Sequence, residues 1–337
     1  MTQTSGFSRE GDVVQLSAKA HGKVNLLLGV GQARADGYHE LTTVFQSLTL
    51  ADEVTVSFDQ STPVLPGATA VRMLSVVGPG SEEVPVDDAN LAWKAADLAV
   101  AAARDMGLNT WPTLSLSISK GIPVAGGMAG GSADAAAVLL LVQRYAAQRG
   151  YQIGEAHLKE LALEIGSDVP FCLSGGTMLG RGRGEQLIPM ISRHTYHWAL
   201  AFASSGLSTK AVFHHLDQLR AAAPAGGAAA PAGLQPITAT EELTTALVSG
   251  DPHQVARQMA NNLQPAALSL KPQLRATLAA GQQAGALRGI VSGSGPTCAF
   301  LCASEEDAQA VAEGLLDSGT CTHAVAAASY PTGIDIN

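Results

Sequence analysis

Residues 123–134 form a glycine-rich segment with four glycines and three alanines, and its last residues include Ser132 and Asp134. Serine and aspartate commonly begin helices, and an apolar run at 135–142 follows them. The alternating segment 114–119 precedes the loop and predicts a half-buried strand. A glycine-rich loop between a strand and a helix N-terminus offers free N–H groups and the positive end of the helix dipole to an anion. We therefore predict a phosphate site in this segment.

The loop alone does not decide the function, because glycine-rich segments also form flexible turns and small residues also let helices pack closely. A P-loop is excluded, since no Gly-Lys-Ser/Thr sequence ends the segment. The glycine spacing and the lack of a downstream acidic partner also fit a dinucleotide fingerprint poorly. At this point the sequence predicts an anion site without naming its ligand.

Two lysines and an asparagine interrupt an apolar, β-favouring run at 13–30. They are Lys19, Lys23 and Asn25. A lysine inside a buried strand requires a partner, so Lys23 is a candidate functional cation. The alternative is a bulge or an edge strand whose lysines reach solvent, and it suits Lys19 better than Lys23.

Two further positions combine chemically useful side chains with a turn. Tyr38 and His39 follow a turn signal and could stack on and hydrogen-bond a planar ring, although such pairs also occur on ordinary strands. Asp168 lies in a tight turn between Gly166 and Pro170. It is either a turn-forming or N-cap aspartate or a base held on a rigid turn.

The chain has 337 residues and a net charge of −9. That length suggests two domains. The acidic balance argues against a nucleic-acid partner, which would need a basic surface, but it does not exclude a small phosphorylated ligand. No apolar run approaches the length of a membrane span, and residues 1–11 are polar, so we expect neither a membrane partner nor a signal peptide. The four cysteines form no Cys-x-x-Cys pair, and the predicted location is the cytoplasm.

The order of predicted elements indicates an α+β fold. In the second half, strands alternate with helices, which are placed at 208–220, 241–248, 253–263, 272–284 and 305–316. Residues 221–236 are low in complexity and rich in Ala, Gly and Pro, which predicts a mobile loop. We place the domain limits at 1–192 for an N-terminal domain that contains the predicted phosphate site and at 193–337 for a C-terminal domain.

Several short motifs, taken together, resemble those of the GHMP kinases. The glycine-rich segment resembles the central nucleotide motif of that superfamily, and Gly293-Ser-Gly-Pro matches its C-terminal glycine motif. The motifs that narrow the resemblance to the 4-diphosphocytidyl-2-C-methyl-D-erythritol kinase family are Lys23-Val-Asn-Leu, Arg34-Ala-Asp-Gly-Tyr-His, Asp88-Ala-Asn-Leu91 and Gly166-Ser-Asp-Val-Pro. The resemblance covers the chain from near residue 17 to near residue 302.

The resemblance implies a two-lobed GHMP-kinase-like fold with the active site in the cleft between the lobes. It implies ATP-dependent phosphorylation of the 2-hydroxyl of a small molecule that bears cytidine diphosphate, in non-mevalonate isoprenoid biosynthesis, with ATP and Mg²⁺ as cofactors. Asp168 matches the family's catalytic aspartate, which accepts the hydroxyl proton, and Lys23 matches its partner lysine. An alcohol is a poor nucleophile, so a carboxylate and an ammonium beside it suit this chemistry.

The resemblance also assigns ligand-binding positions. Tyr38 and His39 match the pair that recognises cytidine, Asn25 a polar residue near the substrate, and Phe213 a second aromatic that sandwiches cytosine. Asn90 and Lys120 match positions near the adenine. The residues that would wrap the ATP phosphates are Pro123, Val124, Ala125, Gly126, Gly127, Met128, Ala129, Gly130, Gly131, Ser132 and Ala133. Mg²⁺ would bridge the phosphates, and among protein groups we expect only Ser132 near the metal.

The glycine-rich segment departs from the family pattern where glycine, leucine or serine is frequent, at Ala125, Met128, Ala129 and Ala133. Alanine permits close approach of a ligand but does not easily adopt a positive φ, which bears on the shape of the loop more than on its role. Two alternatives stay open: a GHMP kinase for another small alcohol, and a nucleotide-binding protein without catalysis. The sequence does not indicate the oligomeric state.

Overall fold

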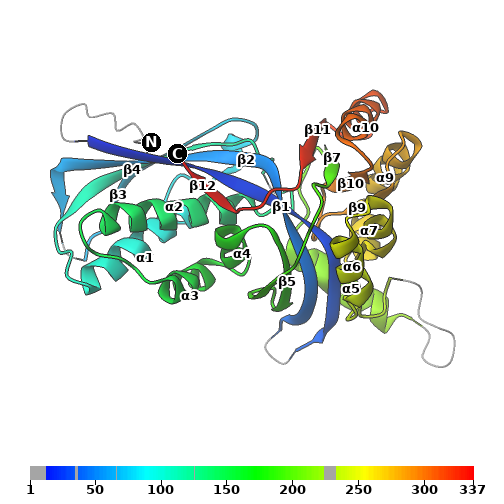
Figure 1. Cartoon of the computed structure of the whole chain (residues 1–337), viewed down its shortest axis with the longest axis horizontal. Coiled ribbons are helices and arrows are strands. Elements are labelled where there is room, and N and C mark those ends of the chain that lie inside the picture. The colour runs from blue at the N-terminus through cyan, green and yellow to red at the C-terminus, as the bar shows by residue number, and fades with distance from the viewer. Residues whose placement is uncertain (1–12, 35–36, 66, 125, 224–232) are drawn as a thin grey trace.

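A computed structural model describes residues 13–34, 37–65, 67–124, 126–223 and 233–337. Two sheets, each with its own helices, form the predicted two-lobed α+β fold (Figure 1). The first sheet contains β1 (Val13–Ala33), β2 (His39–Val64), β3 (Val71–Val77), β4 (Trp111–Ser119), β5 (Thr177–Gly182), β6 (Gln186–Pro189), β8 (Ala260–Asn261) and β12 (Ile334–Ile336). The second contains β7 (His197–Phe202), β9 (Arg288–Val291), β10 (Cys298–Cys302) and β11 (His323–Ala328), in the order β11-β7-β10-β9.

The helices divide between the two sheets (Figure 1). Those of the first lobe are α1 (Leu91–Asp105), α2 (Gly130–Ala147), α3 (Glu155–Ile165) and α4 (Val169–Ser174), with a short 3-10 turn, η1, at Ser81–Glu83. Those of the second are α5 (Thr209–Ala221), α6 (Glu241–Ser249), α7 (Pro252–Gln258), α8 (Gln264–Leu270), α9 (Gln273–Gln283) and α10 (Glu305–Asp317).

The long strands β1 and β2 connect the lobes (Figure 1). They pair antiparallel along most of their length, and β2 pairs with β4 through residues 53–64 and with β5 through residues 41–46. The register of β1 against β2 shifts between His21 and Lys23 and again between Asn25 and Leu27. These bulges fall within the polar interruption seen in the sequence, and they re-aim side chains that a regular strand would place on alternating faces.

The core of the first lobe lies between its sheet and helices α1 and α2. The ring of Phe58 on β2 stacks on Tyr145 of α2 with centroids 4.0 Å apart, and Trp111 of β4 packs beside them. Much of α2 is alanine, which lets the helix approach the sheet closely. The helix start is thereby fixed on the same framework that carries β1 and β2.

Some predicted elements differ from the observed ones. The helix expected at 253–263 is wrong beyond Gln258, because the chain forms the short strand β8 and then begins α8. The Asn261 side-chain amide donates to the carbonyl oxygens of Val291 and Gly293, and Asn262 bonds the backbone of neighbouring segments. These tertiary hydrogen bonds outweigh the local helical pattern. Sequence reasoning also missed α4 and β12.

The predicted domain limits, 1–192 and 193–337, stay a prediction. After the second sheet the chain returns to the first, where β12 pairs antiparallel with residues 18–20 of β1. Of the loop expected at 221–236, residues 224–232 lie outside the described part of the chain. Among the described residues, no helix is both long enough and apolar enough to cross a membrane.

Candidate active site

One cleft of about 1210 Å³ brings together most of the chemically interesting side chains. Its walls come from β1, β2, the glycine-rich loop, the segment before α4, helix α5 and the turn after β9. The candidate residues that line it are Lys23, Asn25, Tyr38, His39, Gly127, Ala129, Asp168 and Phe213. The cleft therefore contains the predicted catalytic pair, part of the predicted phosphate loop and the predicted base-binding pair.

Lys23 is buried and held by named partners, so the alternative in which it snorkels to solvent is wrong. Its Nζ donates to Asn25 Oδ1 at 2.8 Å and to the Gly127 carbonyl oxygen at 3.1 Å. Asn25 in turn donates from Nδ2 to the hydroxyl of Thr43 at 2.8 Å. Lys19, by contrast, is exposed on the same strand. The ammonium thus sits between the sheet and the glycine-rich loop, at the wall of the cleft.

Asp168 occupies the N-cap position of α4, yet its side chain makes no capping hydrogen bond. Pro170 is the second residue of that helix and lacks an N–H donor, so one of the groups that an N-cap carboxylate could bond is missing. Among the described residues, Asp168 and Lys23 form no ion pair, although both line the cleft. The carboxylate is left available to a hydroxyl group bound between the two.

The glycine-rich loop lies against the turn that contains the second glycine motif. Gly127 and Ser292, which meet there, are 165 residues apart in the sequence. A Cβ added to Gly127 would lie 2.7 Å from the Ser292 carbonyl oxygen, and one added to Gly126 would lie 2.9 Å from the Thr297 hydroxyl oxygen. The Lys23 N–H also donates to the carbonyl oxygen of Met128 at 3.1 Å. The loop is therefore fixed from two sides, by β1 and by the turn after β9.

The loop contains an alanine in a left-handed conformation, contrary to the expectation that alanine avoids positive φ. Ala129 has φ 60° and ψ 27°, at the residue before α2. This conformation costs an alanine about 1–2 kcal/mol, and strain of this kind persists where the surroundings fix the backbone. Lys23 and the second glycine motif supply that fixation on the residues just before it.

Gly127→Ala tests how tightly the two glycine motifs pack. Gly127 has φ +74°, and the added methyl group would meet backbone rather than a movable side chain. We expect a loss of about 2 kcal/mol or more in unfolding free energy, measured by urea denaturation, with a raised KM for ATP. The matched control is Ala129→Gly, which removes strain two residues away and should stay within about 1 kcal/mol of wild type. Equal stability of both variants would contradict the packing described here.

Helix α2 begins at Gly130, two residues before the predicted start at Ser132. Its N-cap is Ala129, which makes no side-chain capping bond, so the capping role expected for Ser132 and Asp134 is wrong. Ser132 is half-buried in the first turn. Asp134 is buried and accepts a hydrogen bond from Lys120 Nζ at 2.8 Å, and this distant partner explains why it does not cap the helix.

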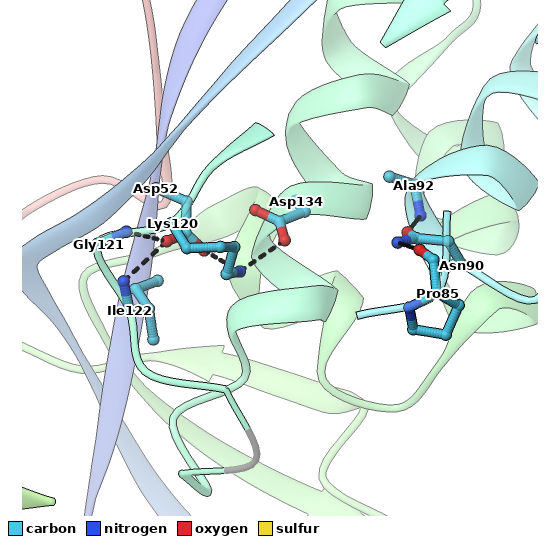
Figure 2. A network of polar contacts seen from close by, with 8 residues as sticks. All are labelled: Asp52, Pro85, Asn90, Ala92, Lys120, Gly121, Ile122 and Asp134. Atoms are coloured by element: carbon cyan, nitrogen blue, oxygen red, sulfur yellow. Dashed lines mark hydrogen bonds and ion pairs between the residues drawn. The ribbon is translucent and has the colours of Figure 1, made fainter. Parts of the chain in front are cut away.

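Several predicted ATP-site residues do not line the cleft. Asn90 is the N-cap of α1, where Oδ1 accepts from the Ala92 N–H and Nδ2 donates to the Pro85 carbonyl oxygen. Figure 2 shows it apart from Lys120, whose ammonium lies between Asp52 and Asp134. Ala125 lies outside the described residues. The others away from the cleft wall are Pro123, Val124, Gly126, Met128, Gly130, Gly131, Ser132 and Ala133.

The other end of the cleft is aromatic. The His39 ring lies 5.1 Å from that of Phe213 on α5, and its Nε2 lies 2.9 Å from Asp217 Oδ1. Tyr38 is 53% exposed, with the guanidinium carbon of Arg183 5.0 Å from its ring centroid. Exposed aromatic faces beside a buried imidazole can hold a planar ring by stacking and by hydrogen bonds.

Sequence reasoning missed Thr43, Asp217 and the contact between the Thr209 and Ser294 hydroxyls, 2.9 Å apart. Thr43 lies within a continuous buried run of β2, residues 42–48, and gives no local signal. Asp217 is 178 residues from His39, on the polar side of a helix. The helical spacing from Phe213 to Asp217 places both on one face, which is the signal that could have suggested a shared site.

Comparison with known proteins shows the family to which this chain belongs. A family model for the N-terminal domain of GHMP kinases matches residues 90–176, and a model for their C-terminal domain matches residues 243–320. A protein of Corynebacterium diphtheriae called 4-diphosphocytidyl-2-C-methyl-D-erythritol kinase is 52% identical over 303 residues, which are 89% of this chain and 92% of that protein. The chain belongs to the GHMP kinase family. As a kinase of this family it uses ATP.

Further comparisons agree with this assignment and confirm the resemblance seen in the sequence. A protein of the same name from Nocardia farcinica is 50% identical over 313 residues, 93% of each chain. A crystal structure of 4-(cytidine 5'-diphospho)-2C-methyl-D-erythritol kinase has a TM-score of 0.69 and 30% identity, covering 93% of this chain and 98% of that one. The structure of L. major mevalonate kinase with R-mevalonate, at TM-score 0.68 and 14% identity, shows the shared fold.

Proposed function

We propose that this kinase transfers the γ-phosphoryl group of ATP to the 2-hydroxyl of 4-diphosphocytidyl-2-C-methyl-D-erythritol, giving the 2-phosphate and ADP. The reaction belongs to the non-mevalonate route to isoprenoid precursors. The observation that carries the proposal is that Lys23 and Asp168 line the same cleft as Tyr38, His39 and Phe213. The names of the relatives at about 50% identity support the same substrate. We keep the cytoplasm as the proposed location.

Asp168 is the proposed base. Its carboxylate accepts the proton of the 2-hydroxyl while the oxygen forms its bond to the γ-phosphorus, and the bond from that phosphorus to the bridging β-oxygen breaks as ADP leaves. The lack of a capping bond supports this role, because a carboxylate bound to its own helix would have its acceptor capacity already occupied. The N-cap position fixes the backbone of Asp168, so little backbone entropy is lost on binding.

Lys23 is the proposed electrostatic partner. Its ammonium is directed by Asn25 and by the Gly127 carbonyl oxygen, which leaves one of its three N–H groups without a described partner. A positive charge at this wall stabilises the negative charge that develops on the transferred group. Asn25 is the proposed substrate neighbour whose Oδ1 sets the direction of that ammonium.

ATP, the phosphoryl donor, is proposed to bind along residues 123–133, with its phosphates toward the N-terminus of α2. That terminus is suitable, since no side chain caps it. Mg²⁺ fits here as an ion carried mainly by ATP phosphates, with the Ser132 hydroxyl as the protein group that would help to hold it. When bound, Mg²⁺ neutralises phosphate charge. Asn90 and Lys120 stay the predicted neighbours of the adenine, although their side chains already have partners.

The acceptor's cytosine is proposed to lie between Tyr38 and Phe213, with its edge toward His39. Asp217 accepts from His39 Nε2 in the tautomer that carries the proton there, and Nδ1 is then an acceptor. An acceptor suits the exocyclic amino group of cytosine and not the carbonyl oxygen at the same position of uracil. The His39–Asp217 contact therefore supports a cytidine rather than a uridine nucleotide.

The test is an assay of ADP production with ATP and a panel of small alcohols that includes the cytidylylated methylerythritol. Tyr38→Ala should raise the KM for that substrate by about 10- to 100-fold, since stacking on a base contributes about 1–3 kcal/mol. Tyr38→Phe, which keeps the ring, is the matched control and should stay close to wild type. The KM for ATP should not change in either variant.

Each outcome of that assay separates the proposed function from one alternative. Turnover of another alcohol, unaffected by Tyr38→Ala, would indicate a GHMP kinase with a different acceptor. ATP binding without turnover of any alcohol would indicate a nucleotide-binding protein without catalysis. Turnover of the cytidylylated substrate that is insensitive to Tyr38→Ala would overturn the stacking role alone.

A further inference from the structure

A buried network of three ionisable side chains lies beside the start of the glycine-rich loop and the start of helix α2. Lys120 Nζ donates to Asp52 Oδ2 and to Asp134 Oδ2 (Figure 2). The exposed fractions of the three side chains are 4% for Lys120, 0% for Asp52 and 3% for Asp134. Burying three charges costs several kcal/mol per ion before pairing, so a network of this kind requires a structural or functional reason.

The network connects both ends of the loop to one strand. Asp52 lies on β2, and its Oδ1 accepts from the backbone N–H groups of Gly121 and Ile122 at 2.7 and 2.8 Å, where the loop begins. Asp134 lies in the second turn of α2, beyond the point where the loop ends. Lys120 joins Asp52 to Asp134, so the start of the loop and the start of α2 are both anchored to β2.

The loop sequence is adapted to this network. A Cβ on Gly130, the first residue of α2, would lie 3.2 Å from Lys120 Nζ and 3.5 Å from Asp52 Oδ2. The ammonium thus packs against the backbone of the helix start itself. A shift of either carboxylate would therefore move the N–H groups that the helix presents to an anion.

The charged groups of the network are paired with one another rather than directed toward a ligand. Burial, and then the Asp52 carboxylate, raise the pKa of Asp134. Burial alone would lower the pKa of Lys120, but Asp134 and Asp52 outweigh it and raise that pKa. The ammonium stays charged and is shared between two carboxyl groups, which makes it a poor partner for the ATP phosphates. We therefore expect Lys120 to influence ATP binding through the position of the loop and helix backbone, not by contact with the phosphates.

We propose that Asp52, Lys120 and Asp134 are positioning residues that hold the two ends of the glycine-rich loop in register and thereby set the affinity for ATP. The proposal rests on the proposed function in placing the triphosphate on this loop. It assigns the role to residues that touch neither the cleft nor the acceptor, since none of the three lines the cleft wall. Loss of the network should therefore affect the two substrates unequally.

The test uses Asp134→Asn, which keeps the shape of the side chain and leaves Lys120 paired with Asp52. We expect the Kd of a non-hydrolysable ATP analogue, measured by calorimetry on the full chain, to rise about tenfold, because small displacements of anchoring groups have effects of this size. The KM for the acceptor at saturating ATP should stay within about twofold. Asp52→Asn should act in the same direction.

The matched control is Asp97→Asn. Asp97 on α1 accepts from the Thr69 hydroxyl at 2.8 Å and the Ala70 N–H at 3.0 Å, so it also joins a helix to a strand of this lobe, away from the loop. It should change the melting temperature without changing the Kd of the analogue. If Asp134→Asn fails to fold, Asp52→Asn takes its place, because it leaves Lys120 intact and bonded to Asp134, and its Kd should rise as well.

Two results would overturn the proposal. One is an unchanged Kd for the analogue in the folded Asp134→Asn or Asp52→Asn variant. The other is an equal rise in the constants for ATP and for the acceptor, which would indicate a general loosening of the lobe. Because the calorimetric measurement needs no acceptor, it remains decisive even if the wild-type chain proves to phosphorylate a different alcohol.

Discussion

Asp168→Asn should lower kcat by about 10²- to 10⁴-fold, while the KM for ATP stays within about twofold. The amide has the shape of the carboxylate but cannot take up a proton from the hydroxyl group. Asp168 makes no capping hydrogen bond, so its replacement removes no backbone contact of α4 and the melting temperature should change little. The measurement is initial-rate kinetics of ADP release with the cytidylylated substrate, together with thermal denaturation.

The matched control for this variant is Glu164→Gln. Glu164 is another acid on the wall of the same cleft, at the end of α3, and its loss changes the local charge by the same amount. A general electrostatic effect would slow both variants similarly, whereas the role of a base predicts a large effect at Asp168 alone. Turnover of Asp168→Asn within about tenfold of wild type would remove the base from the proposed mechanism.

Local signals in the sequence were sufficient for elements whose ends are set locally. The alternation at 114–119 falls within β4, and α10 runs from Glu305 to Asp317, one residue beyond the helix predicted at 305–316. Both depend on residues that are neighbours in the chain. The motifs around Lys23 and Asp168, the predicted catalytic pair, could be recognised for the same reason, since each lies within a run of four or five residues.

Residues whose role depends on a distant partner were misread or missed. Asp134 looks like a helix cap by type and position, but its carboxyl group bonds instead to Lys120, fourteen residues earlier, in the core. The helix then begins at Gly130 without a side-chain cap, which leaves its N–H groups available. The sequence around Asp217 does not indicate a functional role, because its contact with His39 forms only when α5 packs against β2. Long-range pairing of this kind is not encoded in a local pattern.

Lys23→Met should lower kcat by about 10²- to 10³-fold, the loss expected when one preorganised donor is removed from a site of charge development. Methionine preserves most of the aliphatic length beside Phe45, whose ring centroid lies 5.5 Å from Nζ. The variant leaves Asn25 Oδ1 and the Gly127 carbonyl oxygen without their shared donor, so we also expect a loss of about 1–3 kcal/mol in stability. The matched control is Lys19→Met, on the exposed face of the same strand.

A double-mutant cycle with Asp168→Asn separates a catalytic role of Lys23 from a purely structural one. If the ammonium acts through the carboxylate and the transferred group together, the double variant should be little slower than Asp168→Asn alone, because groups that work as a unit are strongly non-additive. If Lys23 only holds the loop, its effect should multiply with that of Asp168→Asn and appear mainly in the KM for ATP. The first outcome is the one that the geometry favours, since a single cleft holds both groups at the end of the glycine-rich loop.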